Sequence, residues 1–165
     1  MFTTLESARL RFRQYRESDF PELLAFHNDA LTKSVYGELH ADEVWRRMAT
    51  GLGHWQLRGF GPFALEHRES GAYVGACSLW FPQGWQDIEI GYHIAPQFRR
   101  QGFAAEAVRR IREHGYKDRG FGKLVSYIQP SNLASQAVAR SVGAITDGEF
   151  EMSGKLHIVF VHPKH

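Results

Sequence analysis

The most informative stretch of this chain is Ile94-Ala95-Pro96-Gln97-Phe98-Arg99-Arg100-Gln101-Gly102-Phe103-Ala104-Ala105-Glu106-Ala107. It indicates a strand that ends at Ala95-Pro96, a basic turn around Gly102, and a helix after the turn. The N–H groups at the start of a helix point outward with partial positive charge, and Gly102 lets a ligand approach the backbone closely. Arg99 and Arg100 add formal positive charge. The segment therefore predicts a phosphate site, for which a pyrophosphate is the natural ligand.

The sequence before this segment predicts strands and two helices. A helix start lies at Ser18-Asp19, and a second helix is expected from Asp42 past Met48 towards Gly51. Alternating or β-rich residues indicate strands over residues 9–13, 62–67, 72–80 and 87–94. The turn at 68–71 makes the second and third of these strands a hairpin.

The sequence after the segment predicts one long helix, a strand, a second helix and a closing pair of strands. The first helix has apolar or small residues at helical spacing, namely Ala104, Val108, Ile111 and Gly115. The second helix starts after Asn132, and its expected apolar face comprises Leu133, Ala134, Ala137, Val138 and Val142. Strands are expected over residues 123–129, 144–150 and 155–162. This order predicts an α/β (α+β) fold with a mixed sheet in a single domain over residues 1–165.

The bulk properties agree with one compact domain and exclude several classes of protein. The chain has 165 residues, 43% of them apolar and 23% charged, which is ordinary globular composition. Its net charge of +2 is too small to indicate nucleic-acid binding by itself. No stretch matches a membrane span, residues 1–6 are unlike a signal peptide, and the single cysteine, Cys77, rules out an internal disulfide. We therefore expect a cytoplasmic protein in which Cys77 belongs to the core.

The turn described above also resembles a known motif. Arg99-Arg100-Gln101-Gly102-Phe103-Ala104 is similar to the acetyl-CoA motif of the GNAT superfamily of N-acetyltransferases, in which Gln or Arg is followed by two residues, Gly, one residue, and Gly or Ala. Its position between a strand and an amphipathic helix makes the match more specific. Features elsewhere resemble the RimJ/RimL-like branch: residues 8–13 followed by Asp19, Glu89-Ile90-Gly91-Tyr92, and Asn132, Ser135, Val138 and Gly143.

The resemblance implies a twisted, mostly antiparallel sheet that splays apart at the acetyl-CoA site. The backbone around Tyr92 to Ile94 would pair with the pantetheine arm and offer an N–H group to the thioester carbonyl. The cofactor-binding residues are then expected to be Tyr92, Ile94, Arg99, Arg100, Gln101, Gly102, Phe103, Ala104, Ala105 and Asn132. The implied activity is transfer of an acetyl group from acetyl-CoA to a primary amine by direct attack in a ternary complex, with no metal.

Glu89 is the first candidate for the general base. An amine with a pKa near 10 is mostly protonated at neutral pH, so a base or a water relay must take its proton. Glu89 lies mid-strand on the face opposite Ile88 and Ile90, and His93 lies on the same face as an alternative base. The alternative interpretation is that the Glu89 carboxylate orders the sheet or binds substrate and does not exchange a proton.

Ser135 is the candidate that stabilises the departing thiolate. Many GNAT enzymes carry a tyrosine four residues further along this helix, but Ala139 stands there in this chain. The branch resemblance favours Ser135, with Asn132 hydrogen-bonding the cofactor, whereas a purely structural reading makes Asn132 a helix cap and Ser135 a first-turn polar residue. Some relatives have a glutamate at the position of Tyr127, so the identity of the general base stays undecided. Tyr127 could contact substrate or cofactor, but an aromatic residue in a strand more often belongs to ordinary sheet packing.

Other patterns leave further alternatives. Of the nine histidines, His162 and His165 at the C-terminus are expected to be solvated, and no set of residues forms a convincing metal site. Aromatic residues that could shape an acceptor pocket are Tyr36, Trp45, Trp55, Trp80, Phe81 and Trp85, and acceptor specificity is assigned to loops at 35–40 and 83–86. The rival functions are a non-catalytic CoA-binding module and, on a basic stripe of Arg99, Arg100, Arg109, Arg110 and Arg112, a nucleic-acid binder. The sequence does not decide whether the acceptor is a protein N-terminus or a small-molecule amine. A homodimer is possible, and the oligomeric state is also undecided.

Overall fold

The fold is built on one eight-stranded sheet. The structure is a computed structural model that describes residues 4–164. The strands lie in the order β1-β2-β3-β4-β5-β6-β8-β7, and every neighbouring pair is antiparallel except β5 and β6. Their bounds are β1 Leu5–Glu6, β2 Leu10–Arg13, β3 Pro62–His67, β4 Tyr73–Trp80, β5 Ile88–Ile94, β6 Leu124–Ile128, β7 Ile145–Met152 and β8 Lys155–Val161. The predicted mixed, mostly antiparallel sheet is confirmed, and the two-residue strand β1 is an addition that the sequence pattern was too short to indicate.

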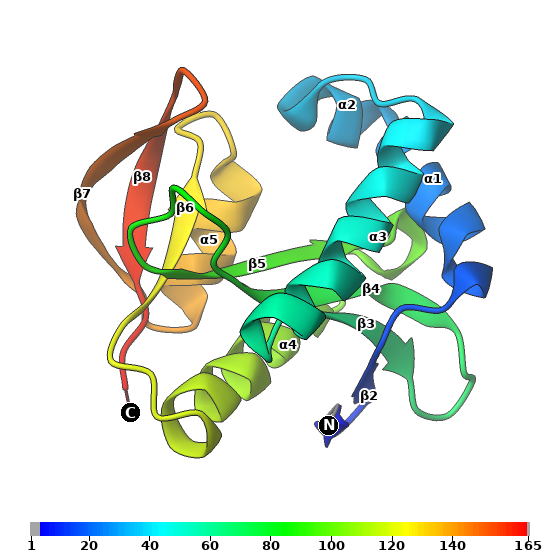
Figure 1. Cartoon of the computed structure of the whole chain (residues 1–165), viewed down its shortest axis with the longest axis horizontal. Helices are drawn as coiled ribbons and strands as arrows, with labels where there is room; N and C mark the ends of the chain where they lie inside the picture. The colour runs from blue at the N-terminus through cyan, green and yellow to red at the C-terminus, as the bar shows by residue number, and fades with distance from the viewer. Residues whose placement is uncertain (1–3, 165) are drawn as a thin grey trace.

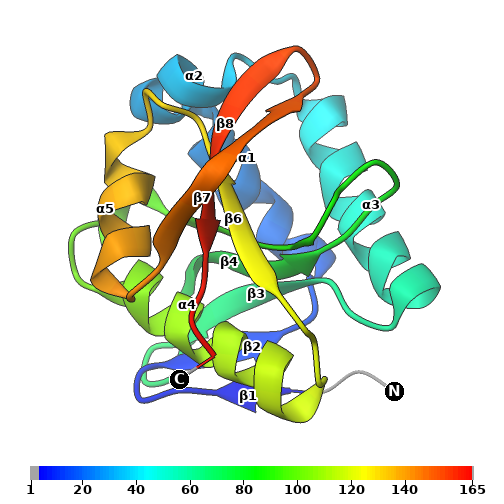
Figure 2. The same ribbon diagram turned by 90° about the vertical axis from the view of Figure 1, so that its left-hand side faces the viewer.

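Helices cover both faces of the sheet. They are α1 Phe20–Asn28, α2 Ala30–Tyr36, α3 Ala41–Arg58, α4 Phe103–Glu113 and α5 Leu133–Ser141. Figure 1 shows α1, α2 and α3 together on one side of the molecule, while β6, β7 and β8 form a separate arm. Figure 2, viewed from the side of that arm, places α3 and α5 on opposite sides of it.

The alternation of side chains along the central strands explains why both faces are covered. Phe12, Phe63 and Leu65 point to one face and pack with the buried side chains of α4, including Val108 and Ile111. On the other face, Ala64 and Tyr73 pack with Leu23, Val44 and Met48 from α1 and α3. Because each face of the sheet presents apolar side chains, each needs a helical layer to remove them from water.

The helical region before β3 differs from the sequence expectation in two ways. The helix expected to end near Gly51 continues to Arg58, and residues 35 and 36, expected in a loop, lie in α2. Gly51 is buried, and a Cβ atom there would lie 2.7 Å from Pro62 Cγ, so this glycine is required by close packing rather than by a turn. Gly59, with φ +73°, is the residue that ends α3.

The parallel strands β5 and β6 separate soon after they meet. Their pairing is limited to Ile88 with Leu124 and Glu89 with Val125. At the next position the Ser126 hydroxyl donates to the Ile90 carbonyl at 2.6 Å and lies 2.9 Å from His162 Nε2. The Ile90 carbonyl is therefore occupied by a side chain and cannot accept a backbone hydrogen bond from β6. The predicted splay of the sheet is confirmed, and this side-chain contact is its local cause.

The expectation for His162 was wrong, and His165 lies outside the described residues. His162 is 2% exposed, and burial lowers its pKa to about 4, so the imidazole is neutral at physiological pH. The backbone N–H of His162, directly after β8, donates to the Leu124 carbonyl at the start of β6 at 2.9 Å, which brings this histidine into the core beside Ser126. Its position near the chain end therefore does not indicate solvent exposure.

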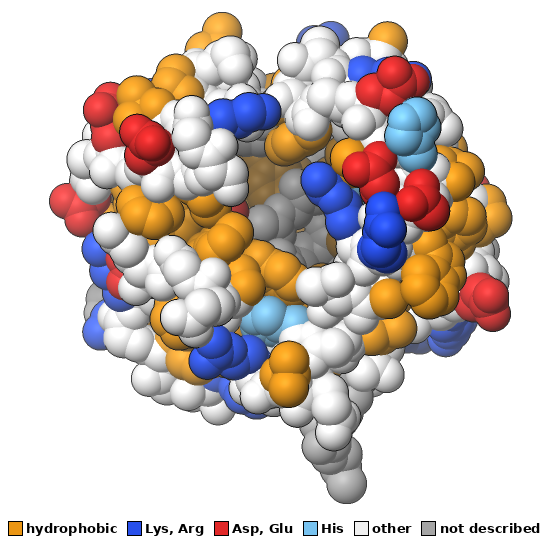
Figure 3. All heavy atoms as spheres, turned by 45° about the horizontal axis from the view of Figure 1, so that its top comes forward, with side chains coloured by type: hydrophobic (Ala, Val, Ile, Leu, Met, Phe, Trp, Pro, Cys, Tyr) orange, Lys and Arg blue, Asp and Glu red, His pale blue; other side chains and the backbone are white. Residues whose placement is uncertain are grey.

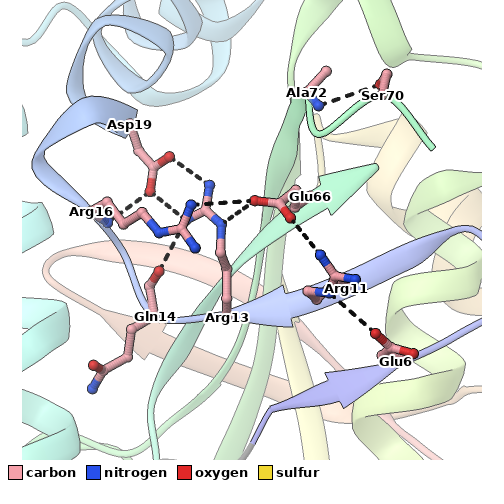
Figure 4. Close-up of polar contacts among 9 residues, drawn as sticks. All are labelled: Glu6, Arg11, Arg13, Gln14, Arg16, Asp19, Glu66, Ser70 and Ala72. Carbon is pink, nitrogen blue, oxygen red and sulfur yellow. Dashed lines mark hydrogen bonds and ion pairs between the residues drawn. The ribbon is translucent and has the colours of Figure 1, made fainter. Parts of the chain in front are cut away.

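A buried ion-pair network joins the start of α1 to strands β2 and β3 of the sheet (Figure 4). Arg13 donates to both carboxylate oxygens of Asp19 at 2.8 Å and to Glu66 Oε2 at 2.7 Å. Asp19 also accepts from the backbone N–H of Arg16, directly before α1. All of Arg13, Asp19 and Glu66 are less than a tenth exposed. Asp19, which the sequence predicted as a helix start, therefore also holds the start of the helix to the sheet through charged hydrogen bonds.

Candidate active site

Three cavities meet around the splayed strands, and Tyr36 and Tyr92 line all three. The α4–α5 cavity, about 680 Å³, runs between the start of α4 and the exposed side of α5. The α1–α3 cavity, about 280 Å³, lies under α1 and α3 beside β4 and β5, and the β6 cavity, about 310 Å³, lies between β5 and β6. Figure 3 shows the molecule hollowed on the face that carries α2, with hydrophobic side chains in the walls and basic side chains at the rim.

The α4–α5 cavity collects nearly all of the predicted cofactor-binding residues. Its lining includes Tyr92, Ile94, Arg99, Arg100, Gly102, Phe103, Ala104, Ala105 and Asn132, together with Ser135. Gln101 is absent from the lining because its side chain donates to the Gln97 carbonyl and its own carbonyl accepts from Arg9. The turn and the first turn of α5 are thus brought together although about thirty residues of chain separate them.

The turn before α4 presents unpaired backbone N–H groups. Gly102 is left-handed at φ +82° and caps the helix, and Arg100 also has a positive φ of 60°. For the backbone N–H groups of residues 100–105, the described part of the chain offers no hydrogen-bond acceptor, and the first capping bond runs from Glu106 N to the Gly102 carbonyl. Buried or cleft-facing N–H groups require a partner, and a helix N-terminus favours an anion. This geometry is what the sequence predicted for a phosphate site.

The two arginines of the turn have different environments. Arg99 Nη1 lies 2.8 Å from Asp29 Oδ2, and Arg99 Nη2 lies 3.0 Å from Thr32 Oγ1. The charge of Arg99 is therefore balanced within the protein, and the residue ties the turn to α2. Arg100 is exposed and is the arginine of the turn that is left to meet an anion.

The expected apolar face of α5 is only partly buried. Leu133 is 72% exposed, and Ala134 and Ala137 are exposed as well. Ala134 and Ala137 line the α4–α5 cavity instead of the core, where Gln136 and Ala139 are buried. The sequence pattern identified a real apolar face but could not tell which part of it is buried, because a wall of an open cavity and a core face have the same periodicity.

Glu89 lies in the β6 cavity, next to the residues of the α4–α5 cavity. Its Oε2 accepts a hydrogen bond from the Trp85 indole at 2.7 Å. Burial raises the pKa of Glu89 to about 7, although hydrogen bonds from Trp85 and from the Tyr127 backbone act to lower it. A carboxyl group with this pKa can take up or release a proton at neutral pH.

His93, the alternative base, is half-buried, lines the α1–α3 and α4–α5 cavities and already has side-chain partners. Its ring stacks on Phe26 with centroids 4.4 Å apart, and Nε2 lies 2.9 Å from the Tyr73 hydroxyl. Burial lowers the pKa of His93 to about 3, and the charges of neighbouring groups lower it further. A nitrogen of such low basicity that already has a hydrogen-bond partner is a poor proton acceptor, so the geometry favours Glu89.

Ser135 and Tyr92 form a pair of hydroxyl groups at the meeting point of the cavities. The Tyr92 hydroxyl is buried and makes no hydrogen bond of good geometry to the described residues. Burial raises the pKa of Tyr92 to about 12, while the nearby Ser135 hydroxyl acts to lower it. The sequence pattern indicated a role only for the backbone of Tyr92, because its alternation with Ile90 and Ile94 is that of a core residue and gives no sign that its hydroxyl reaches the cavities.

Asn132 caps α5, as the structural reading of the sequence expected. Its Oδ1 accepts from the Ser135 backbone N–H at 3.1 Å. Its Nδ2 lies 3.4 Å from the Tyr36 hydroxyl, which links the cap to α2 across the cavity. The cap and a role at the cavity are therefore compatible.

Several other candidates are structural. The Tyr127 hydroxyl accepts from the Asp87 backbone N–H, and its ring contacts Phe150, which is the expected sheet packing. Cys77 is fully buried, and burial raises the pKa of its thiol, so it belongs to the core as expected. Of the predicted pocket aromatics, Trp80 lines the α1–α3 cavity and Trp85 the β6 cavity, whereas Trp45 is 50% exposed and lines none of the three.

The basic stripe on α4 is largely used within the protein. Arg109, Arg110 and Arg112 donate to the carbonyls of Ser141, Glu6 and Val142 respectively. These contacts hold α4 against the start of the chain and the end of α5. Guanidinium groups committed to carbonyls are less available to a nucleic-acid backbone.

Neither a membrane-spanning helix nor a cluster of metal ligands is present in the described part of the chain. Among residues 4–164 no helix is long and apolar enough to cross a bilayer. In the same range no group of three or more His, Cys, Asp or Glu side chains is arranged to hold a metal ion.

Comparison with known proteins agrees with this geometry. Residues 9–145 match the family model described as "Acetyltransferase (GNAT) domain". The chain is 30% identical over 147 residues to the uncharacterized protein YkkB of Bacillus subtilis (strain 168), covering 86% of this chain and 84% of YkkB. The crystal structure of an acetyltransferase from Agrobacterium tumefaciens str. C58 superposes with a TM-score of 0.88 at 25% identity, covering 99% of this chain and 95% of that one.

A further solved structure shares the fold. It is RimL, a ribosomal L7/L12 alpha-N-protein acetyltransferase, in complex with coenzyme A, with a TM-score of 0.75, 20% identity and 96% coverage of both chains. At this level of identity the likeness shows the fold. The matched family model and the relatives together show that the chain belongs to the GNAT family of acetyltransferases and is an acyltransferase.

Proposed function

We propose that residues 1–165 form one N-acetyltransferase domain that binds acetyl-CoA in the α4–α5 cavity and transfers the acetyl group to a primary amine in a ternary complex. The observation that carries this proposal is the turn at 100–105, whose N–H groups have no acceptor in the described chain and stand at the mouth of a large, mostly apolar cavity. An apolar channel with an anion site at one end matches a long ligand that carries phosphates.

The residues present fit coenzyme A. The N–H groups of the turn and the side chain of Arg100 would hold the diphosphate, because they are unpaired and positively polarised. Ala104, Ala134 and Ala137 leave room for the pantetheine arm along β5, beyond the point where β5 stops pairing with β6. When bound, acetyl-CoA supplies the acetyl thioester; the chemistry of the protein lies in the groups around it.

Glu89, Ser135 and Tyr92 would carry out the proton movements. Glu89 in its ionised form takes the proton of the attacking amine, either directly or through a water molecule. The hydroxyl groups of Ser135 and Tyr92 donate hydrogen bonds to the sulfur as the thiolate departs. A backbone N–H of residues 92–94 would stabilise the negative charge on the carbonyl oxygen.

Thermal denaturation with acetyl-CoA tests the first step. A ligand that binds only the folded protein stabilises it by about 2.7 kcal/mol at 100 times its Kd, which raises the melting temperature. Arg100→Gln should weaken this effect, while Arg119→Gln, which removes a charge beyond the end of α4, should not. An unchanged melting temperature with acetyl-CoA at millimolar concentration would overturn the proposal.

Release of free thiol over a panel of amines tests the second step. A non-catalytic CoA-binding module would show the thermal shift without thiol release above the rate of acetyl-CoA alone. The oligomeric state, which the sequence leaves open, is measured by sedimentation equilibrium with and without acetyl-CoA.

A further inference from the structure

We infer that the α1–α3 cavity binds the body of the acceptor, and that the acceptor is an amine that also carries a carboxylate and a bulky apolar group, as a large apolar amino acid does. This inference rests on the proposed function, because it takes the reaction centre to lie where the three cavities meet. It selects among the acceptors left open above.

The α1–α3 cavity opens directly toward the proposed base. Gly91 lines both this cavity and the β6 cavity that contains Glu89. A Cβ atom at Gly91 would lie 3.0 Å from Ser78 Oγ and 4.0 Å from Glu89 Oε1. The absence of a side chain at Gly91 therefore leaves a passage between the two cavities, through which the amine of an acceptor could reach Glu89.

The walls of the cavity suit an apolar group. They include Leu23, Phe26, Val44, Met48, Pro62 and Trp80, from α1, α3 and the central strands. Its volume of about 280 Å³ is small for a folded polypeptide segment but sufficient for one large side chain. Burial of an apolar side chain against these residues would contribute much of the binding free energy.

The charged side chain that lines the α1–α3 cavity is positive. No Asp or Glu is among its lining residues, whereas Arg47 is, and Arg47 has no ion pair or hydrogen bond within the described residues. His27 also lines the cavity; it is 9% exposed and has no hydrogen-bond partner among residues 4–164. Burial and the charge of Arg47 lower the pKa of His27, so it is a neutral imidazole next to a guanidinium. A carboxylate would satisfy Arg47, and a second cation there would be repelled.

Glu89 provides the opposite charge at the other end of this path. It is the single Asp or Glu among the described residues that line the β6 cavity. An ammonium group at Glu89 and a carboxylate at Arg47 would orient a zwitterionic acceptor across Gly91. A polyamine would place its second ammonium against Arg47, and a peptide N-terminus has an amide where the carboxylate is required.

Steady-state transfer assays with four acceptors test the inference. The probes are L-phenylalanine, L-phenylalaninamide, the dipeptide phenylalanylglycine, and spermidine, each with saturating acetyl-CoA. We expect kcat/KM for phenylalanine to exceed that for phenylalaninamide by about 10- to 100-fold, the effect of one charge-assisted hydrogen bond. Equal or faster transfer to the amide, the dipeptide or spermidine would overturn the inference.

Two neighbouring variants separate the role of Arg47 from general loss of charge. Arg47→Gln should lower kcat/KM for phenylalanine about 10- to 100-fold and leave that for phenylalaninamide within about twofold. Arg46→Gln is the matched control, because both arginines are exposed on the same helix but Arg46 pairs with Asp42 and does not line the cavity. Equal effects of the two variants would overturn the assignment of Arg47.

Binding measurements keep this inference separable from the proposed function. Both variants should show the same thermal shift with acetyl-CoA as the unsubstituted protein. Calorimetry with coenzyme A present should detect phenylalanine binding and its loss in Arg47→Gln. If acetyl-CoA binds but none of the probes binds or reacts, the acceptor class is wrong and the acetyl-CoA site stands; if acetyl-CoA does not bind, both proposals fail.

Discussion

The carboxyl group of Glu89 shows how one buried residue connects stability to chemistry. In water its pKa would lie near the ordinary glutamate value, and burial in the β6 cavity raises it to about 7. Because the folded protein binds the proton more tightly than the unfolded chain, the protonated form is favoured by folding. This contribution to the free energy of unfolding is fully present below the pKa that Glu89 has in the unfolded chain. It is lost as the pH rises through the pKa of about 7 in the folded protein.

Glu89→Gln should therefore be less active and more stable at pH 8. Loss of a general base lowers kcat by about 100- to 10,000-fold, and the limb of the pH profile that rises through about 7 should disappear. The free energy of unfolding at pH 8 should rise by on the order of 2 kcal/mol, with little change at pH 4. Initial rates and urea denaturation across pH 4–9 measure both effects.

Glu149→Gln, on the exposed strand β7, is the control and should change neither quantity. If Glu89→Gln keeps the rate and the pH profile, Glu89 only orders the sheet or binds substrate.

Tyr92→Phe tests the second hydroxyl group at the proposed reaction centre. The buried hydroxyl has no partner of good geometry in the free protein, so its removal should leave stability unchanged or slightly higher. If it donates to the departing sulfur, kcat should fall about 10-fold while the KM for acetyl-CoA stays nearly constant. An increase in KM at constant kcat would show that the hydroxyl contributes to ground-state binding and not to the reaction.

At the scale of elements, the point where β5 and β6 separate depends on a side chain rather than on the strands alone. Ser126 donates to the Ile90 carbonyl and accepts from His162, and both partners are inside the protein. Strand propensity predicted where β5 and β6 begin, but it contains no information about where two parallel strands stop pairing. That depends on a contact between residues 36 positions apart in the sequence.

Ser126→Ala should lower the stability of the fold and the affinity for acetyl-CoA. Removal of the hydroxyl leaves the Ile90 carbonyl and the His162 imidazole without their partner, at a cost of about 1–3 kcal/mol in the free energy of unfolding. We also expect a higher KM for acetyl-CoA, because the edge of β5 lines its proposed site. Ser70→Ala, in the turn between β3 and β4, serves as the control. A Ser126→Ala protein with unchanged stability and unchanged KM would contradict this account of the splay.

At the scale of the molecule, the network of Arg13, Asp19 and Glu66 joins the start of α1 to strands β2 and β3. Burial acts to raise the pKa of Glu66, but the hydrogen bond and charge of Arg13, helped by Arg11, outweigh it and hold this pKa below its usual value. The pKa of Arg13 is raised by its hydrogen bonds to Asp19 and Glu66. The position of α1 relative to the sheet, and with it the α1–α3 cavity, thus depends on charges.

Glu66→Gln should destabilise the protein by about 2 kcal/mol at pH 7, the effect of a hydrogen bond between charged groups. Since the folded pKa of Glu66 is lowered, its stabilising effect is present above the unfolded pKa and disappears as the pH falls through the folded value. The difference in melting temperature between the variant and the unsubstituted protein should therefore shrink as the pH is lowered toward 3. Glu69→Gln, in the exposed turn after β3, should show no difference at any pH. A pH-independent difference would indicate that the network acts through packing alone.

Local sequence was enough to predict the positions of the strands along the chain, most helices, the turn before α4, the helix cap at Asn132 and the family, because each of these depends on local periodicity, on glycine geometry or on a short motif. The tertiary structure alone decided that Arg99 is neutralised by Asp29, that the small residues of α5 face a cavity, and that His162 is buried at the branch of the sheet. It also brought Glu89, Tyr92 and Ser135 to one place. The physical reason is that pairing, burial and the resulting pKa shifts depend on neighbours far away in the chain, which no local pattern specifies.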